Sequence, residues 1–512
     1  MNNGKNYYKT PLKLVAYIIA LLIVVSFVPK DISIFGYTPK HVDIFADLKS
    51  QPKTKTSNVD KETNKEEIQN EGTDEEFIDP DYVAPDSGSD LQHDSSQRFD
   101  LKTKAHLNFA SMPIVEIISD AAYSLIGAEK TKVDNIYAGR IKTHPQPITG
   151  NVGQLRYFFD ALKNVKNKKV RVAHYGDSAI EGDLITADIR KILQGKFGGK
   201  GVGFLSIVSK DINFRTTTKQ SFSSNWEFAS LFTNNLKHYE LGISGTVSIP
   251  KGSAWVKYKT TRRYRNVKTF NEARLFYSDA KRNAKITYSV DNKSNKSAKL
   301  KSGKRVNELK IDAGHSATQI KFNFPKKGLG HFYGVSLEGG NGIYVDNLPL
   351  RGNTGTDLQL INDSVYKEFA KKMNYKLIIL EFGLNAASSI KGNFSWYERE
   401  MEKVINKLKK DFPRTSIILF SVHDKSKKNG SRFVTDPVIL KLIKAQKNIV
   451  RKTRVAFWNM WESMGGRNSM PKWVNSNPPH AFKDYTHFND QGAKVIAKMF
   501  SQALLKAYNK HH

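Results

Sequence analysis

The stretch around Ser178 constrains the fold more than any other part of this sequence. Residues 169–173 (Lys-Val-Arg-Val-Ala) predict a short, partly buried strand, and 174–178 (His-Tyr-Gly-Asp-Ser) follow directly. Apolar residues then recur at helical spacing over 179–194, at Ile180, Leu184, Ile185, Ile189, Ile192 and Leu193. A strand that becomes a helix at Gly-Asp-Ser places the serine hydroxyl at the carboxyl edge of a sheet, beside the first N–H groups of the helix.

Two interpretations of Ser178 follow from this position. The hydroxyl can be a nucleophile for acyl transfer, because N–H groups at the start of a helix stabilise negative charge that develops nearby. Alternatively, the residue belongs to a simple strand-to-helix turn in which Ser178 or Asp177 caps the helix. Gly-Asp-Ser is short and common, so these residues alone leave the two interpretations balanced.

The last third of the sequence alternates between strand and helix patterns. The predicted strands are 342–347, 376–381, 416–422 and 455–458, and the predicted helices are 363–373, 397–411, 437–452 and 491–508. This alternation predicts an α/β fold with a central parallel sheet and helices on both faces. Because sites in such sheets lie at the carboxyl ends of the strands, we expect the residues that follow each strand to meet there.

A different pattern separates the first part of this domain (101–200) from the second (342–512). Residues 221–340 show short alternating runs between Gly, Asn, Asp and Pro turns, which predicts an inserted all-β sandwich of jelly-roll type. Its aromatic residues either pack inside or form a sugar-binding face, and packing is favoured for most of them. The glycine-rich loop at 198–203 lacks the features of a phosphate-binding loop, so we expect it to lie beside the site.

The N-terminal region indicates export. Residues 1–13 carry three lysines and no acidic residue, and 14–28 (LVAYIIALLIVVSFV) form an apolar run. Residues 1–30 therefore predict an uncleaved membrane anchor, with a cleaved signal as the alternative; the lack of a small-residue cleavage site favours the anchor. Within 50–100, the segment 60–100 carries 14 acidic and 3 basic residues, which predicts an acidic, disordered linker. A helix at 114–126 is also expected, in the segment that leads from this linker to the first part of the α/β domain.

Charge and cysteine content exclude several classes of function. The net charge is +32, yet the basic residues are spread along the chain without a zinc-finger, RNP-like or Arg-rich pattern, so we do not expect nucleic acid as a partner. Anionic lipid headgroups or an anionic cell-wall polymer suit a membrane-tethered protein of this charge better. The absence of cysteine excludes thiol catalysis, thiolate metal sites and disulfides.

Two further places can join Ser178. Asn385 follows the predicted strand 376–381 and can offer its side-chain amide to an oxyanion. Asp484 and His487 stand three residues apart just before the last helix. The aspartate can accept the Nδ1 proton of the imidazole, which leaves Nε2 free to act as general base on a serine. Taken alone, this pair is equally well explained as a surface turn that caps the closing helix.

In this order the segments resemble the blocks of the SGNH (GDSL-type) hydrolase family. The first block matches Gly176-Asp177-Ser178, the third matches Gly383-Leu384-Asn385, and the last matches Asp484-Tyr485-Thr486-His487. The second block is a glycine, for which Gly355 within 347–358 is the best match and Gly352 the second. Ala386 stands where the family more often has Asp or Glu, a position outside the chemistry. The resemblance covers about 152–197 and 342–512.

The resemblance implies a role for each matched residue. Ser178 is the nucleophile, His487 is the general base and then acid, and Asp484 orients His487. The oxyanion hole consists of the N–H of Ser178, the N–H of Gly355 and the side chain of Asn385. No metal or organic cofactor is implied. The competing candidates are His174, Asp177, which we expect to support the turn, and His480, which either lines the site or is merely exposed.

A narrower resemblance is to bacterial peptidoglycan O-acetylesterases, and it rests on the sandwich inserted just after the first helix and on Phe-Gly-Gly-Lys-Gly-Val-Gly-Phe at 197–204. It implies a serine esterase that removes O-acetyl groups from a cell-wall glycan, with peptidoglycan first, anchored in the bacterial inner membrane and facing the periplasm. Some relatives instead transfer acetyl groups to a glycan, often beside a membrane acyl carrier protein, which would then be a partner. A carbohydrate-binding scaffold with a vestigial site is the third alternative.

Overall fold

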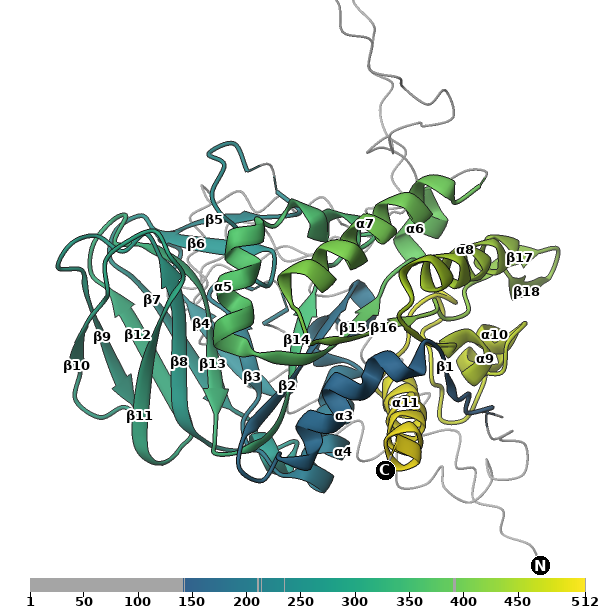
Figure 1. Ribbon diagram of the computed structural model, residues 1–512, viewed down its shortest axis with the longest axis horizontal. Helices are drawn as coiled ribbons and strands as arrows, with labels where there is room; N and C mark the ends of the chain where they lie inside the picture. Colours follow the sequence, from purple (N-terminus) through teal and green to yellow (C-terminus); the bar gives the residue numbers. More distant parts are fainter. Residues whose placement is uncertain are drawn as a thin grey trace, which may run out of the picture. The chain divides into compact units, whose positions relative to one another are not determined.

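The computed structural model describes residues 141, 143–209, 211–212, 214–233, 235–389 and 393–511. They form an α/β domain and an all-β domain inserted between α4 (Thr186–Phe197) and β14 (Gly342–Pro349) (Figure 1). The predicted apolar segment 14–28, linker 50–100 and helix 114–126 lie outside the described residues. Within those residues, no helix is both long and apolar enough to cross a bilayer.

A six-stranded sheet forms the centre of the α/β domain, in the order β1-β19-β16-β15-β2-β14. Neighbouring strands are parallel except for β1, which pairs antiparallel with β19. The strand that leads to Ser178, β2, lies between β14 and β15, which both follow the insertion. The bounds of the remaining strands are β1 (Ile148–Gly150), β2 (Lys169–Gly176), β15 (Tyr375–Glu381), β16 (Ser416–Phe420) and β19 (Ala456–Trp458).

Helices cover both faces of this sheet, as the alternation of patterns predicts. Successive side chains of a strand point to opposite faces, so Val172 and Ala173 of β2 belong to two different hydrophobic cores. The core around Val172 includes side chains of α3 (Arg156–Lys163), α4 and α11 (Asp490–His511), and the core around Ala173 includes those of α5 (Asp363–Met373), α7 (Ser395–Asp411) and α8 (Pro437–Thr453). Shorter helices are α6 (Leu384–Ser389), α9 (Met460–Ser463), α10 (Ser469–Val474) and the 3-10 helices η4 (Val152–Leu155), η5 (Ser178–Asp183), η6 (Arg265–Val267) and η7 (Thr356–Leu360).

The inserted domain consists of two facing sheets around a third core. It begins at Gly203, earlier than the predicted 221, because β3 pairs with β13. One sheet contains β10 (Lys296–Lys299), β9 (Lys285–Val290), β12 (Gln319–Phe324), β7 (Ala254–Thr260) and β4 (Thr218–Phe222). The other contains β11 (Asn307–Ala317), β8 (Phe270–Ser278), β13 (His331–Glu338), β6 (Thr246–Pro250) and β5 (Trp226–Ser230), with β3 (Gly203–Ser206) beside β13.

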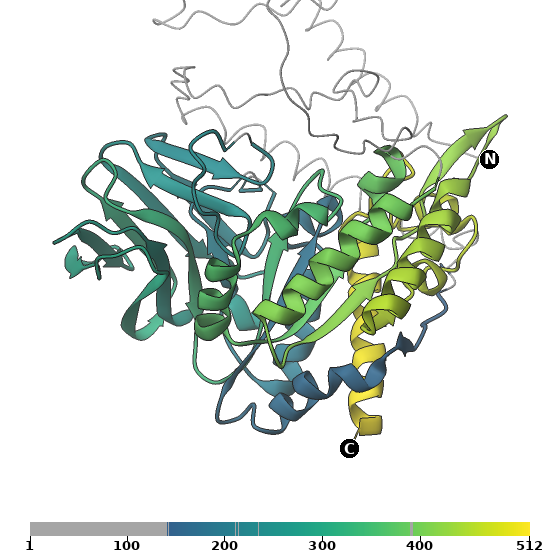
Figure 2. The ribbon, with the colours of Figure 1, turned by 45° about the horizontal axis from the view of Figure 1, so that its top comes forward.

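The inserted domain packs directly on the α/β domain, and the two lie side by side in both views (Figures 1 and 2). Phe369 of α5 contacts the rings of Phe276 and Tyr333 at centroid distances of 5.6 Å each. Arg171 of β2 pairs with Glu338 of β13, and both side chains are fully buried. The strand that leads to Ser178 is thus fixed to the inserted domain by a buried ion pair.

Two expectations for the segment after Ser178 are wrong. The predicted continuous helix over 179–194 is interrupted, since η5 contains non-helical residues at Glu181 and Gly182 and α4 begins only at Thr186. Ser178 therefore starts one short 3-10 segment, where a helix macrodipole contributes little. The glycine-rich loop 198–203 does not lie beside the site. Gly198 O accepts a hydrogen bond from Ile343 N at the amino end of β14, whereas Ser178 follows the carboxyl end of the parallel strand β2.

Candidate active site

Ser178 stands directly after the carboxyl end of β2, at the point where the chain leaves the sheet. Asp177 holds the turn, because its Oδ1 accepts a hydrogen bond of 3.0 Å from Ala179 N and its own N–H donates to Glu381 O at the end of β15. Asp177 is buried whereas the Ser178 side chain is partly exposed. The expected supporting role of Asp177 therefore agrees with its contacts.

The structure brings Ser178, His487 and Asp484 together from segments 309 residues apart. The Oγ of Ser178 lies 3.3 Å from Nε2 of His487, and Nδ1 of His487 lies 2.7 Å from Oδ2 of Asp484. The second contact assigns the ring proton to Nδ1, because an ionised carboxylate can only accept. Nε2 is then unprotonated and faces the serine hydroxyl, which is the arrangement a general base requires.

The turn that carries Asp484 and His487 is closed by its own hydrogen bonds. Oδ1 of Asp484 accepts from the backbone N–H groups of Thr486 and His487, at 2.9 and 3.0 Å. Partial burial alone would raise the pKa of Asp484, but these bonds and the one from the His487 ring outweigh it and lower the pKa to about 2. Asp484 is therefore a carboxylate at any pH at which His487 can act as a base.

The two other predicted oxyanion donors both contact Asn353. Gly355 N donates to Asn353 Oδ1 at 2.7 Å, and Nδ2 of Asn385 donates to Asn353 O at 2.9 Å. Gly355 has a φ of 92°, and a Cβ there would lie 2.7 Å from the Phe382 ring, so the position requires glycine. Asn385 is also 3.5 Å from Asp177 Oδ2, which places it beside the serine turn.

The competing histidines have other partners. His174 is fully buried below the serine turn, where Nε2 contacts Glu381 Oε2 and Nδ1 contacts Thr186 Oγ1, both at 2.9 Å. Asn347 Nδ2 donates to the same Thr186 oxygen, so the hydroxyl proton is free to point to Nδ1 and the ring proton lies on Nε2. His480 Nδ1 contacts Ser476 Oγ at 2.8 Å. Neither ring reaches the Ser178 hydroxyl through these contacts.

Burial raises the pKa of Asp177 to about 7, and the nearby charge of Glu381 adds to this effect, whereas the hydrogen bond from Ala179 N opposes it. An unfolded aspartate titrates near 3.8. The folded protein thus binds a proton at Asp177 that the unfolded chain has lost between these two values. The free energy of unfolding consequently falls as the pH rises from about 4 to about 7.

We expect Asp177→Asn to stabilise the fold above neutral pH, because asparagine keeps the acceptor for Ala179 N without a buried charge. At about 1.4 kcal/mol per pKa unit, the free energy of unfolding at pH 8 should rise by up to about 4 kcal/mol, and near pH 4 it should hardly change. Urea unfolding at both pH values measures this difference. Equal effects at the two pH values would contradict it.

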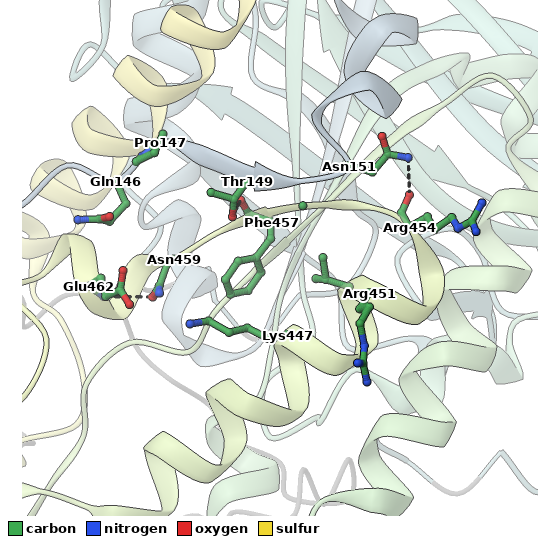
Figure 3. Close-up of a pocket in the computed structure, with 12 residues that line it drawn as sticks. Gln146, Pro147, Thr149, Asn151, Lys447, Arg451, Arg454, Phe457, Asn459 and Glu462 are labelled. Carbon is green, nitrogen blue, oxygen red and sulfur yellow. Dashed lines mark hydrogen bonds between the residues drawn. The ribbon is translucent and has the colours of Figure 1, made fainter.

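A pocket of about 640 Å³ lies away from these residues, between β1, β19 and α8 (Figure 3). Its lining includes Lys447, Arg451 and Phe457, and none of the predicted site residues lines it. A narrower cleft of about 80 Å³ does adjoin the serine turn, because Glu181 of η5 and Arg351 line it together with residues of the inserted domain. In the described part of the chain no group of three or more carboxylates and histidines could hold a metal ion.

Comparison with solved structures extends the similarity over most of the described chain. A peptidoglycan O-acetylesterase is 18% identical, with a TM-score of 0.60, and the superposition covers 71% of this chain and 99% of that one. The chain therefore shares the fold of that protein. No family model matches the sequence, and no curated protein matches it.

Other solved structures superpose over a smaller share of this chain. A GDSL-like lipase from Parabacteroides merdae is 16% identical, covers 32% of this chain and 72% of its own, and has a TM-score of 0.23. A carbohydrate esterase of family 3 from Talaromyces cellulolyticus is 15% identical with the same coverage and a TM-score of 0.25.

Sequence reasoning missed two polar residues of this site. Asn353 contacts both Gly355 and Asn385, and Glu381 holds His174 beneath the serine turn. The sequence pattern contains a signal for each residue. Asn353 lies in the block that contains Gly355, and Glu381 is a carboxylate that directly follows the apolar run 377–380. A buried acidic residue at such a position usually has a specific partner.

Proposed function

We propose that this protein is a serine esterase that removes O-acetyl groups from a cell-wall glycan, with peptidoglycan as the first substrate to test. The observation that carries the proposal is the continuous contact from Ser178 Oγ through His487 to Asp484, at 3.3 and 2.7 Å, at the carboxyl edge of the sheet. The shared fold with a peptidoglycan O-acetylesterase supports the choice of substrate class. The predicted anchor would hold the enzyme at the periplasmic face of the inner membrane.

The geometry supports a two-step acyl transfer. His487 Nε2 accepts the hydroxyl proton of Ser178 while Oγ bonds to the ester carbonyl carbon. When the tetrahedral intermediate collapses, the bond from carbon to the sugar oxygen breaks and the imidazolium returns its proton to that oxygen. Water then adds to the acetyl-serine in the same way, and acetate leaves. Asp484 remains ionised throughout and stabilises the imidazolium.

Stabilising the oxyanion requires an exchange of hydrogen bonds at Asn353. The Gly355 N–H would leave Asn353 Oδ1 and donate to the carbonyl oxygen of the substrate, together with the Ser178 N–H and the Asn385 amide. Asn353 Nδ2 is held by Asp357 Oδ2 at 2.6 Å, so the residue has an anchor that does not depend on Gly355. The oxyanion would thus replace Asn353 Oδ1 as the acceptor of the Gly355 N–H.

Three exposed apolar side chains belong to, or contact, the segments that carry the site residues, including the turn 482–487 (the catalytic turn). Phe482 belongs to the catalytic turn and is 54% exposed, Leu360 ends η7 after Gly355 and is 68% exposed, and Phe214 is 48% exposed. Phe214 packs against Gly182 of η5, since a Cβ on that glycine would lie 2.5 Å from its ring. Their exposure makes them candidates for contacts with an extended ligand.

Gly355→Ala should lower kcat by about 10²–10³-fold, because the new methyl group collides with Phe382 and displaces an oxyanion donor. Gly352→Ala is the matched control: its φ is 77°, so the backbone strain is similar, but no atom lies within 4 Å of the added Cβ. Hydrolysis of 4-nitrophenyl acetate measures both variants. Equal losses in the two variants would assign the effect to backbone strain in the loop and contradict the role of Gly355 as an oxyanion donor.

The substrate itself is tested by acetate release. O-acetylated peptidoglycan incubated with the full chain should yield acetate and a glycan without O-acetyl groups. Adding a glycan acceptor should leave the acetate yield unchanged if water is the true acceptor. A fall in acetate matched by acetylation of the acceptor would instead identify a transferase.

A further inference from the structure

A β-hairpin projects from the carboxyl edge of the sheet next to the proposed active site. It consists of β17 (Ser426–Asn429) and β18 (Arg432–Thr435), which pair antiparallel, and it extends beyond α8 (Figures 1 and 2). Its base is buried: Thr435 Oγ1 donates to Asp424 Oδ1 at 2.8 Å, and Asp436 N donates to Lys425 O at 2.8 Å. The hairpin is therefore a rooted part of the domain.

The base of the hairpin contacts segments on both sides of the site. Lys425 Nζ donates to Ser388 Oγ at 2.9 Å, in the helix α6 that carries Asn385. Ser426 N donates to Tyr485 O at 3.0 Å, within the catalytic turn. Phe433 stacks on Tyr485 with a centroid distance of 3.7 Å and an interplanar angle of 8°. The hairpin thus leaves the sheet between the proposed oxyanion helix and the turn that holds His487.

The hairpin is strongly cationic. Residues 425–435 include Lys425, Lys427, Lys428 and Arg432 and contain no acidic residue. The last three are exposed, and no carboxylate in the described part of the chain forms an ion pair with them. Positive charge without counter-charge, on an element joined to the site, favours a ligand that brings the negative charge itself.

We infer that the hairpin binds carboxylate groups of the polymer whose ester reaches Ser178. This inference rests on the proposed function and narrows the substrate to an acidic polymer, such as a glycan whose attached peptides carry free carboxylates. A polymer that enters the site passes the hairpin, because the hairpin emerges between α6 and the catalytic turn. An anionic bilayer in the same place would compete with the substrate for the mouth of the site.

The test compares substrates of different charge in the full chain. The variant Lys427→Ala/Lys428→Ala/Arg432→Ala should lower kcat/KM on O-acetylated peptidoglycan fragments about tenfold, through KM, because three exposed ionic contacts of modest strength are lost together. Hydrolysis of acetylated xylan, a neutral polymer, and of 4-nitrophenyl acetate should stay unchanged. Added salt should reduce the difference between variant and wild type on peptidoglycan.

A matched control removes the same charge elsewhere. Lys293, Lys296 and Lys299 are exposed on the inserted domain, and replacing all three with alanine should leave every substrate unaffected. A loss with 4-nitrophenyl acetate or xylan in the hairpin variant would overturn the inference, because the hairpin would then only support the catalytic turn. Higher activity of the hairpin variant on peptidoglycan would also overturn it, because the hairpin would then not bind the substrate.

Two more outcomes separate this inference from the proposed function. If wild-type protein releases no acetate from either polymer, the proposed function itself fails, whatever the hairpin does. If the wild type is active but the hairpin variant retains full activity on peptidoglycan and loses binding to vesicles of anionic phospholipid, the hairpin contacts a membrane and the inference is wrong.

Discussion

Ser178→Ala should reduce the hydrolysis of 4-nitrophenyl acetate by a factor on the order of 10⁴ or more. The hydroxyl is the only atom of the side chain that can form the acyl-enzyme, and its removal leaves only the oxyanion donors and substrate binding to accelerate attack by water. The side chain is partly exposed and its one described side-chain contact is the 3.3 Å approach to His487, so the fold should keep its stability. Steady-state kinetics and thermal unfolding of the same preparation measure the two quantities.

A control for this variant is Ser302→Ala, which removes an exposed hydroxyl in the inserted domain and should change neither quantity. Mass spectrometry adds an independent readout, because wild type mixed rapidly with ester should carry an acetyl group on the peptide that contains Ser178. Turnover retained in Ser178→Ala would show that the nucleophile lies elsewhere and would remove the basis of the proposed esterase.

The second large effect is expected for Asp484→Asn, which should lower kcat by about 10³–10⁴-fold. Asparagine can still accept the backbone N–H groups of Thr486 and His487 through its oxygen. Its amide would then face Nδ1 as a donor, which favours the ring tautomer with the proton on Nε2. His487 in that tautomer cannot take the proton of Ser178, so the fold survives and the base is lost.

The pH dependence of activity, measured for the wild type and for two aspartate variants, tests whether Asp484 acts as a carboxylate that orients His487. Because the pKa of Asp484 is about 2, the wild-type profile between pH 5 and pH 9 should show no step from this group. Asp484→Asn should lower the plateau of activity, whereas Asp160→Asn, an exposed aspartate on α3, should leave it unchanged. A variant with wild-type kcat would mean that Asp484 does not orient His487.

Much of the α/β architecture could be predicted because its strands are buried and its helices amphipathic. The helix α5 follows the predicted bounds, and α7, α8, α11, β15 and β16 begin or end within two residues of them. The helix after Ser178 was not predictable in this way. Apolar periodicity continues through 180–193, but Gly182, Asp183 and Ile185 adopt positive φ, and periodicity does not report backbone conformation.

The candidate site could also be predicted only in part. Ser178, Asp484 and His487 could be predicted because each follows a strand or precedes a helix, and strand ends meet at one edge of a parallel sheet. Asn353 lies in the same matched block as Gly355, but its contact with both oxyanion candidates could not be predicted, since that contact depends on the path of a loop. The side of the sheet on which the glycine-rich loop lies was also missed, because spacing does not say whether a loop after a helix returns to the same edge.

The position of the insertion has a consequence for how the chain assembles during its synthesis. β2 leads directly to Ser178, the proposed nucleophile, but its two partners, β14 and β15, leave the ribosome only after the whole inserted domain. Until then a strand that is buried in the folded protein has neither neighbour, and unpaired strands associate with other chains. The rate at which the inserted domain folds therefore sets how soon β14 can reach β2, and mutations that slow it should reduce the yield of soluble enzyme without touching the catalytic residues.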